Sequence, residues 1–117
     1  MATTEPTLTK VGTHALIDVR GASHLDDPAR IEAILRRAAE AAGATILQAH
    51  FHHFGPAMGV TGVLMLAESH ISIHTWPETH FAALDIFMCG AARIDLAIAV
   101  IEGAFEGAQV KVRRMAR

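Results

Sequence analysis

Two neighbouring segments alternate apolar and polar residues, and this alternation constrains the fold more than any other feature of the chain. Residues 70–76 read His-Ile-Ser-Ile-His-Thr-Trp, and residues 81–89 read Phe-Ala-Ala-Leu-Asp-Ile-Phe-Met-Cys. A period of two is typical of β-strands, because successive side chains of a strand point to opposite faces of the sheet. Only a short segment beginning with Pro77 separates the two strands, so we expect them to pair antiparallel.

The rest of the chain predicts strands and helices that complete one sheet. Strands are expected at residues 11–20, 44–53, 60–68 and 110–114. Apolar residues at helical spacing predict one helix that is capped by Asp26 or Asp27 and stopped by Gly43, and a second helix over residues 93–105. Short turns between sequential strands predict a mainly antiparallel sheet with both helices on one face. The expected fold is an α/β (α+β) two-layer sandwich, formed by a single domain over residues 1–117.

The two faces of this sheet differ in chemistry. The aliphatic face, which suits the helices, carries Ile71, Ile73, Leu84, Ile86 and Met88. The opposite face is polar and aromatic, with His70, Ser72, His74, Trp76, Phe81, Asp85, Phe87 and Cys89, and the strand at 44–53 would add His50, His52 and Phe54. We expect such a face to be covered by a second copy about a two-fold axis, which makes a homodimer with four layers in the order αββα.

Composition excludes several classes of partner. Ten Lys and Arg stand against twelve Asp and Glu, without a run of like charge, so we expect neither nucleic acid nor an anionic membrane as a partner. The longest apolar run, residues 60–67, is too short to span a bilayer, and residues 1–8 lack the apolar region of a signal peptide. The single cysteine, Cys89, allows no intrachain disulfide. We therefore expect a cytoplasmic protein that binds a small molecule.

Reactive groups are concentrated around one peptide bond. Ser69 follows Glu68, His74 lies five positions further on, and Cys89 is the only thiol. A serine hydroxyl beside a bond prone to acyl shift, a proton shuttle and a weak acid are the parts from which a chain can build a catalytic carbonyl out of its own backbone.

Other kinds of site find less support in the sequence. Six of the eight histidines lie between positions 50 and 80, but without a CxxC or HExxH pattern we expect no metal site. Glu78 and Asp85 could form a carboxylate pair, although their spacing does not place them within reach of each other. A Ser69–His74 hydrolase would also need an orienting acid and an oxyanion hole. One alternative of another class stays open, a non-catalytic His-rich metal-binding dimer module in which Ser69 is an ordinary turn residue.

A longer pattern identifies a family. Residues 59–78 read Gly-Val-Thr-Gly-Val-Leu-Met-Leu-Ala-Glu-Ser-His-Ile-Ser-Ile-His-Thr-Trp-Pro-Glu, and residues 81–90 read Phe-Ala-Ala-Leu-Asp-Ile-Phe-Met-Cys-Gly. Both closely resemble the short, pyruvoyl-dependent S-adenosylmethionine decarboxylase proenzymes of prokaryotes. The resemblance extends from Gly12-Thr13-His14 to the last strand, so it covers nearly the whole domain.

This resemblance implies a self-processing enzyme. The chain would cut itself between Glu68 and Ser69 into a β chain of residues 1–68 and an α chain of residues 69–117. Ser69 would become a covalent pyruvoyl group, which forms a Schiff base with the substrate amine and accepts the electrons left by departing carbon dioxide. No diffusible cofactor is then needed, and processed αβ protomers would form the homodimer. The product would be the aminopropyl donor for spermidine and other polyamines.

The resemblance also assigns roles to single residues. His74 matches the histidine that assists self-processing, and Cys89 matches the proton donor to the decarboxylated carbon. Thr61, which also supports processing, stands where the family usually carries serine. The substrate-binding positions are Phe54, Trp76 and Glu78, which suit stacking on adenine and holding ribose hydroxyls.

Some positions depart from the family pattern around the substrate. Arg20 and Ala22 replace a common aromatic residue and a cysteine, His80-Phe81 replaces Gly-Tyr, and Met88 replaces threonine. These differences leave the pyruvoyl residues intact. They keep open the alternative of a pyruvoyl-dependent ornithine or arginine decarboxylase on the same scaffold.

Overall fold

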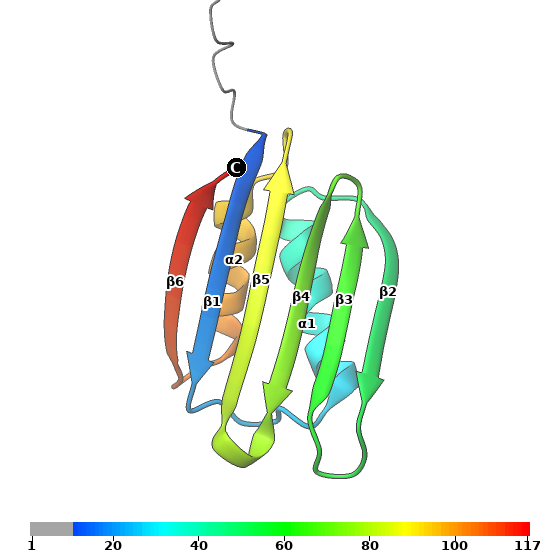
Figure 1. Cartoon of the computed structure of the whole chain (residues 1–117), viewed down its shortest axis with the longest axis vertical. Helices are drawn as coiled ribbons and strands as arrows, with labels where there is room; N and C mark the ends of the chain where they lie inside the picture. Colours follow the sequence, from blue (N-terminus) through cyan, green and yellow to red (C-terminus); the bar gives the residue numbers. More distant parts are fainter. Residues whose placement is uncertain (1–10) are drawn as a thin grey trace, which may run out of the picture.

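A computed structural model describes residues 11–117 of the chain, and residues 1–10 of the predicted domain lie outside the described part. The elements follow in the order β1 (Gly12–Arg20), α1 (Pro28–Ala41), β2 (Ile46–His53), β3 (Val60–Leu66), β4 (Ser69–Trp76), β5 (Phe81–Cys89), α2 (Ile94–Ala104) and β6 (Gln109–Ala116) (Figure 1). A short 3-10 turn, Pro77–Thr79, lies between β4 and β5. The predicted order of strands and helices is confirmed.

The six strands form one sheet in the order β2-β3-β4-β5-β1-β6, and every neighbouring pair is antiparallel. Figure 1 shows α1 and α2 lying side by side behind the sheet, on the same face. This arrangement confirms the predicted two-layer sandwich. In the described part of the chain, neither helix is long and apolar enough to cross a membrane.

Helix α1 begins and ends where its sequence signals predict. The carboxylate of Asp27 accepts a hydrogen bond from the backbone N–H of Arg30 at 3.1 Å, so Asp27 rather than Asp26 is the N-cap. Its buried stripe consists of Ile31, Ile34, Leu35, Ala38 and Ala39. The chain leaves the helix through Gly43, whose φ of 76° lies in the left-handed region that glycine adopts easily.

The core lies between the sheet and the helices. Its strand residues include Ala15, Ile17, Val19, Leu64, Ile71, Ile73, Leu84 and Ile86, all of them buried. The opposite side of the sheet, here called the open face, has no helix of residues 11–117 against it (Figure 1). Pairing of His52 with Thr61, and of Thr61 with His74, places all three side chains on this face. The predicted division into an aliphatic and a polar face is therefore confirmed.

The turn between β3 and β4 corrects two predicted boundaries. We expected the third strand to run to Glu68 and Ser69 to lie in the following turn. Instead, β3 ends at Leu66 and β4 begins at Ser69, which pairs with Leu66, so Ala67 and Glu68 form a two-residue turn. The boundary was wrong because apolar alternation does not distinguish the last residues of a strand from those of a tight turn that continues it.

Candidate active site

Glu68, Ser69 and Cys89 meet at one end of the sheet and are called the thiol cluster below. The backbone N–H of Cys89 donates a hydrogen bond to Ser69 Oγ at 3.3 Å. The thiol Sγ of Cys89 donates to the carbonyl oxygen of Glu68 at 2.9 Å and lies 3.6 Å from Glu68 Oε1. Cys89 therefore contacts both residues of the Glu68–Ser69 bond.

The backbone at this bond is strained. Glu68 has a φ of 59°, in the left-handed region, and it is the second residue of the turn. A residue with a Cβ pays roughly 1–2 kcal/mol to adopt this conformation, and two-residue hairpin turns favour a positive φ at their first residue. Such strain tends to collect at functional sites. Here it falls on the residue whose carbonyl group the Cys89 thiol contacts.

A second group of predicted residues lines a cavity of about 310 Å³ at the other end of β4. The lining consists of Phe54, Met58, Gly59, Thr61, His74, Thr75, Trp76 and Glu78. Five of these, Phe54, Thr61, His74, Trp76 and Glu78, were predicted site residues, and they are called the aromatic pocket below. The structure thus brings together the three predicted substrate-binding residues, Phe54, Trp76 and Glu78. Two predicted processing residues, Thr61 and His74, line the same pocket.

Side chains of the aromatic pocket form a chain of contacts across the open face. Thr61 Oγ1 lies 3.1 Å from His74 Nδ1, within hydrogen-bonding distance. The His74 ring lies 6.2 Å from Trp76, which in turn stacks on Phe81 at 5.5 Å and 23°. Phe54 and Trp76 are 57% and 42% exposed. Two large aromatic surfaces are therefore available to a flat ligand beside the carboxylate of Glu78.

The thiol cluster and the aromatic pocket are far apart within one chain. Ser69 begins β4, and His74 lies five positions along it, which corresponds to roughly 16 Å at about 3.3 Å per residue. Cys89 and His74 lie on the same face, as predicted, but His74 pairs with Ala83, six positions before Cys89. Neither Ser69 nor Cys89 is therefore in contact with His74 of the same chain.

A third group on the open face, His14, His70, Ser72 and Asp85, is called the histidine cluster below. Asp85 Oδ2 accepts hydrogen bonds from His14 Nε2 at 2.7 Å and His70 Nε2 at 2.9 Å, and Ser72 donates to Asp85 Oδ1. Burial alone would raise the pKa of Asp85, but the hydrogen bonds from Ser72, His70 and His14 outweigh it and hold the pKa below its ordinary value. Asp85 is therefore not paired with Glu78, the partner that we considered from sequence.

Sequence reasoning missed His14, although a signal for it was present. Ala15, Ile17 and Val19 are buried in β1, and this alternation turns His14 toward the open face. Pairing of both His14 and His70 with Phe87 brings the two imidazoles close together over one residue of β5.

Within residues 11–117, His14, His70 and Asp85 are the one group with the spacing of a metal site. Arg117 Nη1 lies 3.1 Å from His14 Nδ1. A guanidinium only donates, so His14 Nδ1 accepts and Nε2 carries the proton that it gives to Asp85. A metal ligand would need the opposite arrangement, with a bare Nε2 and an Nδ1–H that donates outward.

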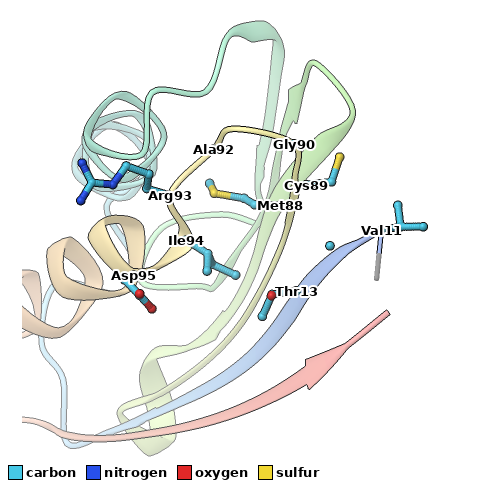
Figure 2. Close-up of a pocket in the computed structure, with 10 residues that line it drawn as sticks. Val11, Thr13, Met88, Cys89, Gly90, Ala92, Arg93, Ile94 and Asp95 are labelled. Carbon is cyan, nitrogen blue, oxygen red and sulfur yellow. The ribbon is translucent and has the colours of Figure 1, made fainter. Parts of the chain in front are cut away.

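A cavity of about 470 Å³ lies near the thiol cluster, between the ends of β1 and β5 and the start of α2. Figure 2 shows Met88 directed toward the helices and Cys89 directed to the other side of β5. Cys89 belongs to the lining of this cavity, but its side chain is directed toward the open face.

Comparison with known proteins assigns the chain to a family. Residues 13–117 match the family model described as S-adenosylmethionine decarboxylase. The chain belongs to the S-adenosylmethionine decarboxylase family. This membership confirms the family that the sequence motif identifies.

Individual members of the S-adenosylmethionine decarboxylase family are similar over much of their length. An S-adenosylmethionine decarboxylase proenzyme from Synechococcus is 51% identical over 82 residues, which cover 68% of this chain and 63% of that protein. A proenzyme of the same name from Thermodesulfovibrio yellowstonii is 44% identical over 99 residues, which cover 82% and 73%. The crystal structure of the adenosylmethionine decarboxylase from Aquifex aeolicus superimposes with a TM-score of 0.84 at 32% identity, covering 94% of this chain and 92% of that one.

Proposed function

We propose that this chain is a self-processing, pyruvoyl-dependent decarboxylase that acts on S-adenosylmethionine. One observation carries the proposal: Cys89 donates one hydrogen bond to the carbonyl oxygen of Glu68 and another to the hydroxyl oxygen of Ser69. The two groups that must react with each other are thereby held by one residue. The name proenzyme, given to the Synechococcus and Thermodesulfovibrio relatives, supports a precursor that is cut.

Self-processing begins with an acyl shift. The Ser69 oxygen attacks the carbonyl carbon of Glu68 and the peptide C–N bond breaks, which leaves an ester on the Ser69 oxygen and a free amine on Ser69. Loss of the α-proton of Ser69 then breaks its Cβ–Oγ bond, so the oxygen leaves with Glu68 as part of a carboxylate. The remaining enamine tautomerises, takes up water and releases ammonia, which gives the pyruvoyl carbonyl at position 69.

The residues around position 69 fit both the formation and the use of this group. A thiol hydrogen bond to the Glu68 carbonyl stabilises the negative charge that develops on its oxygen during the attack. When formed, the pyruvoyl group supplies an electrophilic carbonyl that binds the substrate amine and withdraws the electrons left by departing carbon dioxide. Cys89 Sγ is then placed to return a proton to the substrate carbon.

His74 serves this chemistry from a second copy of the chain. An imidazole that removes the α-proton of Ser69 must lie next to it, and His74 of the same chain is roughly 16 Å away at about 3.3 Å per residue. We therefore propose a homodimer of processed αβ protomers, in which His74 of the partner subunit reaches the thiol cluster. Thr61, which contacts His74 Nδ1, orients the ring.

The geometry of the open face suits this dimer. Ser72 lies between Ser69 and His74 on β4, and a two-fold axis running across the strands at this level brings opposite ends of two sheets together. The thiol cluster of each subunit then faces the aromatic pocket of the other. Val63, Met65 and Met115 are exposed in one chain and would be covered, so that four layers form in the order αββα.

The aromatic pocket supplies the binding site for S-adenosylmethionine. Phe54 and Trp76 offer flat surfaces for the adenine ring. The carboxylate of Glu78 lines the same pocket and can accept hydrogen bonds from ribose hydroxyls. A negative side chain also suits a substrate whose sulfonium carries positive charge. We further propose that the product serves spermidine and polyamine synthesis in the cytoplasm, as the family resemblance implies.

Mass spectrometry of the purified protein tests the processing step. We expect two fragments that correspond to residues 1–68 and 69–117, the second of them beginning with a pyruvoyl group, and an intact chain for Ser69→Ala. Release of labelled carbon dioxide from S-adenosylmethionine, ornithine and arginine, each assayed separately, tests the substrate. A wild-type chain that stays whole after long incubation overturns the pyruvoyl mechanism, and turnover of ornithine or arginine alone overturns the substrate.

A further inference from the structure

The histidine cluster lies directly next to the bond that processing breaks. His70 follows Ser69, and Asp85 binds both His70 and Ser72, the two open-face residues on either side of Ile71. One carboxylate on β5 thus holds His70 and Ser72, the first two open-face side chains of β4.

Processing removes two restraints on the start of β4. The Ala67–Glu68 turn that joins β4 to β3 is opened when the Glu68–Ser69 bond breaks. The hydrogen bond from the Cys89 N–H to Ser69 Oγ is also lost, because that oxygen leaves with Glu68. The first side chain of the new α chain with a remaining hydrogen bond is His70, through its 2.9 Å contact with Asp85.

We propose that Asp85 is a positioning residue that clamps His70 and Ser72 and so keeps the new N-terminus of the α chain beside Cys89 in the mature enzyme. This inference rests on the proposed self-processing function. Asp85 acts through His70 and does not itself touch the reacting atoms.

Asp85 is itself well anchored for this task. His14 on β1 donates to the same oxygen, Oδ2, that His70 contacts, and Arg117 fixes the tautomer of His14 that can donate. Asp85, on β5, is therefore hydrogen-bonded to side chains of both neighbouring strands, β1 and β4. Hydrogen bonds to an ionised carboxylate are roughly twice as strong as those between neutral groups, and the lowered pKa of Asp85 keeps it ionised.

Packing around the carboxylate also restricts the His70 ring. The rings of His14 and His70 lie 5.8 Å and 6.3 Å from Phe87. Phe87 is two positions before Cys89 on the same face of β5. A displacement of His70 would therefore shift position 69 relative to the thiol with which it must work.

The test compares Asp85→Asn with Asp18→Asn, a matched control on the open face of β1. Asp18 lies opposite Ala83 and Lys111 and takes no part in the thiol cluster, the aromatic pocket or the histidine cluster. Cleavage is quantified by mass spectrometry, so that turnover is expressed per cleaved chain. We expect kcat of Asp85→Asn to fall roughly 10- to 100-fold, because small misplacements of a reacting group have effects of this size.

Two readouts distinguish positioning from a general loss of structure. KM for S-adenosylmethionine should change little, since neither Asp85 nor His70 lines the aromatic pocket in which the substrate is proposed to bind. Hydrogen exchange in mature Asp85→Asn should accelerate at residues 70–73 and stay unchanged in α1. Asp18→Asn should resemble the wild type in both respects.

A second pair of variants keeps the inference testable if Asp85→Asn fails to fold or to cut itself. His70→Gln retains an N–H donor for Asp85, whereas His70→Ala removes it. We expect the glutamine variant to keep most of the turnover per cleaved chain and the alanine variant to lose it.

Two results separate this inference from the function on which it rests. Absence of cleavage or of decarboxylation in the wild type overturns the proposed function. If Asp85→Asn shows the same kcat per cleaved chain and the same hydrogen exchange at residues 70–73 as the wild type, only the positioning role is overturned.

Discussion

The thiol of Cys89 donates a hydrogen bond of 2.9 Å to the carbonyl oxygen of Glu68, across 21 residues of sequence. The same residue contacts Ser69 through its backbone N–H. This places the single thiol of the chain beside the acceptor carbon of the proposed acyl shift before any cleavage, and later beside the group that replaces Ser69. In the proposed mechanism, Cys89 therefore acts in both processing and decarboxylation.

Substitution of Cys89 should separate these two roles. In Cys89→Ala, the Glu68 carbonyl loses its donor, so we expect slower cleavage, and turnover per cleaved chain should fall roughly 10²–10⁴-fold because a positioned acid is missing. Cys89→Ser keeps a donor and should cleave faster than the alanine variant. A mass-spectrometric time course and a carbon dioxide assay measure the two effects. Equal cleavage rates for the alanine variant and the wild type would remove the carbonyl contact from the mechanism.

Mixed dimers test whether the site is shared between subunits. Ser69→Ala and His74→Ala chains should each stay largely uncut alone. When they are co-expressed, the mixed dimer contains one site with Ser69 and Cys89 from the second chain and His74 from the first. We therefore expect cleavage to return, only in the His74→Ala chain, and mass spectrometry identifies the cut chain by its mass.

The control for this experiment pairs two variants of the same cluster. Co-expression of Ser69→Ala with Cys89→Ala should leave cleavage of the Cys89→Ala chain at the rate it shows alone, because Ser69 and Cys89 belong to one chain. No recovery in the Ser69→Ala and His74→Ala mixture, although mixed dimers form, would contradict the shared site.

The hydroxyl of Thr61 should be needed through its contact with His74 Nδ1, 3.1 Å away. Thr61→Val removes the hydroxyl at nearly constant volume and is expected to slow self-cleavage roughly 5- to 13-fold, as the loss of an orienting hydrogen bond of roughly 1–1.5 kcal/mol predicts. Thr61→Ser retains the hydroxyl and serves as the matched control. The cleavage rates of the two variants are measured at one pH. Equal rates would show that the Thr61–His74 hydrogen bond has no role in self-cleavage.

Strand alternation predicted more of this molecule than any single motif did. It placed His74, Asp85 and Cys89 on one face correctly, since side-chain direction in a strand depends only on parity. Parity carries no information on the level of a residue along the strand. The level of Cys89 relative to His74 depends on the register between β4 and β5, so their separation, on which the proposed second chain rests, became visible only in the structure.

Long-range pairing set a second limit. The contact of His14 with Asp85 depends on β1 lying beside β5, a neighbour far away in sequence. Alternation within β1 indicates the face on which His14 lies but does not identify the strand beside it. The position of the turn at Glu68 could not be predicted from sequence either, because its left-handed conformation occurs at a residue type that rarely adopts it.

Stability should depend on the ionisation of Asp85 in a defined pH window. Its pKa is lowered in the folded chain, so its stabilising effect is complete above its unfolded pKa of about 4 and is lost as the pH falls through the folded value. In the uncut Ser69→Ala background, the difference in unfolding free energy between Asp85 and Asp85→Asn should be large at neutral pH and shrink below about pH 4. Urea denaturation at several pH values measures it, with Asp18→Asn as the control. A difference that grows as the pH falls below about 4 would have the opposite sign and contradict the assignment.

Thr75 should stabilise the loop that leads into α1. Its buried hydroxyl donates to the carbonyl oxygen of Leu25 at 2.7 Å and accepts from the backbone N–H of Val60 at 2.8 Å. Thr75→Val fills the same space but leaves both backbone groups without this partner, so we expect a loss of about 1–3 kcal/mol of unfolding free energy.

The control for Thr75→Val is Thr79→Val, and both variants are made in the uncut Ser69→Ala background. The exposed Thr79 hydroxyl donates to the backbone carbonyl oxygen of Trp76 at 3.4 Å. Its removal should change the unfolding free energy by less than about 0.5 kcal/mol. Urea denaturation midpoints compare the two variants. If Thr75→Val unfolds at the same urea concentration as Thr79→Val, the buried hydroxyl does not hold the loop, and the position of Leu25 must depend on its apolar contacts alone.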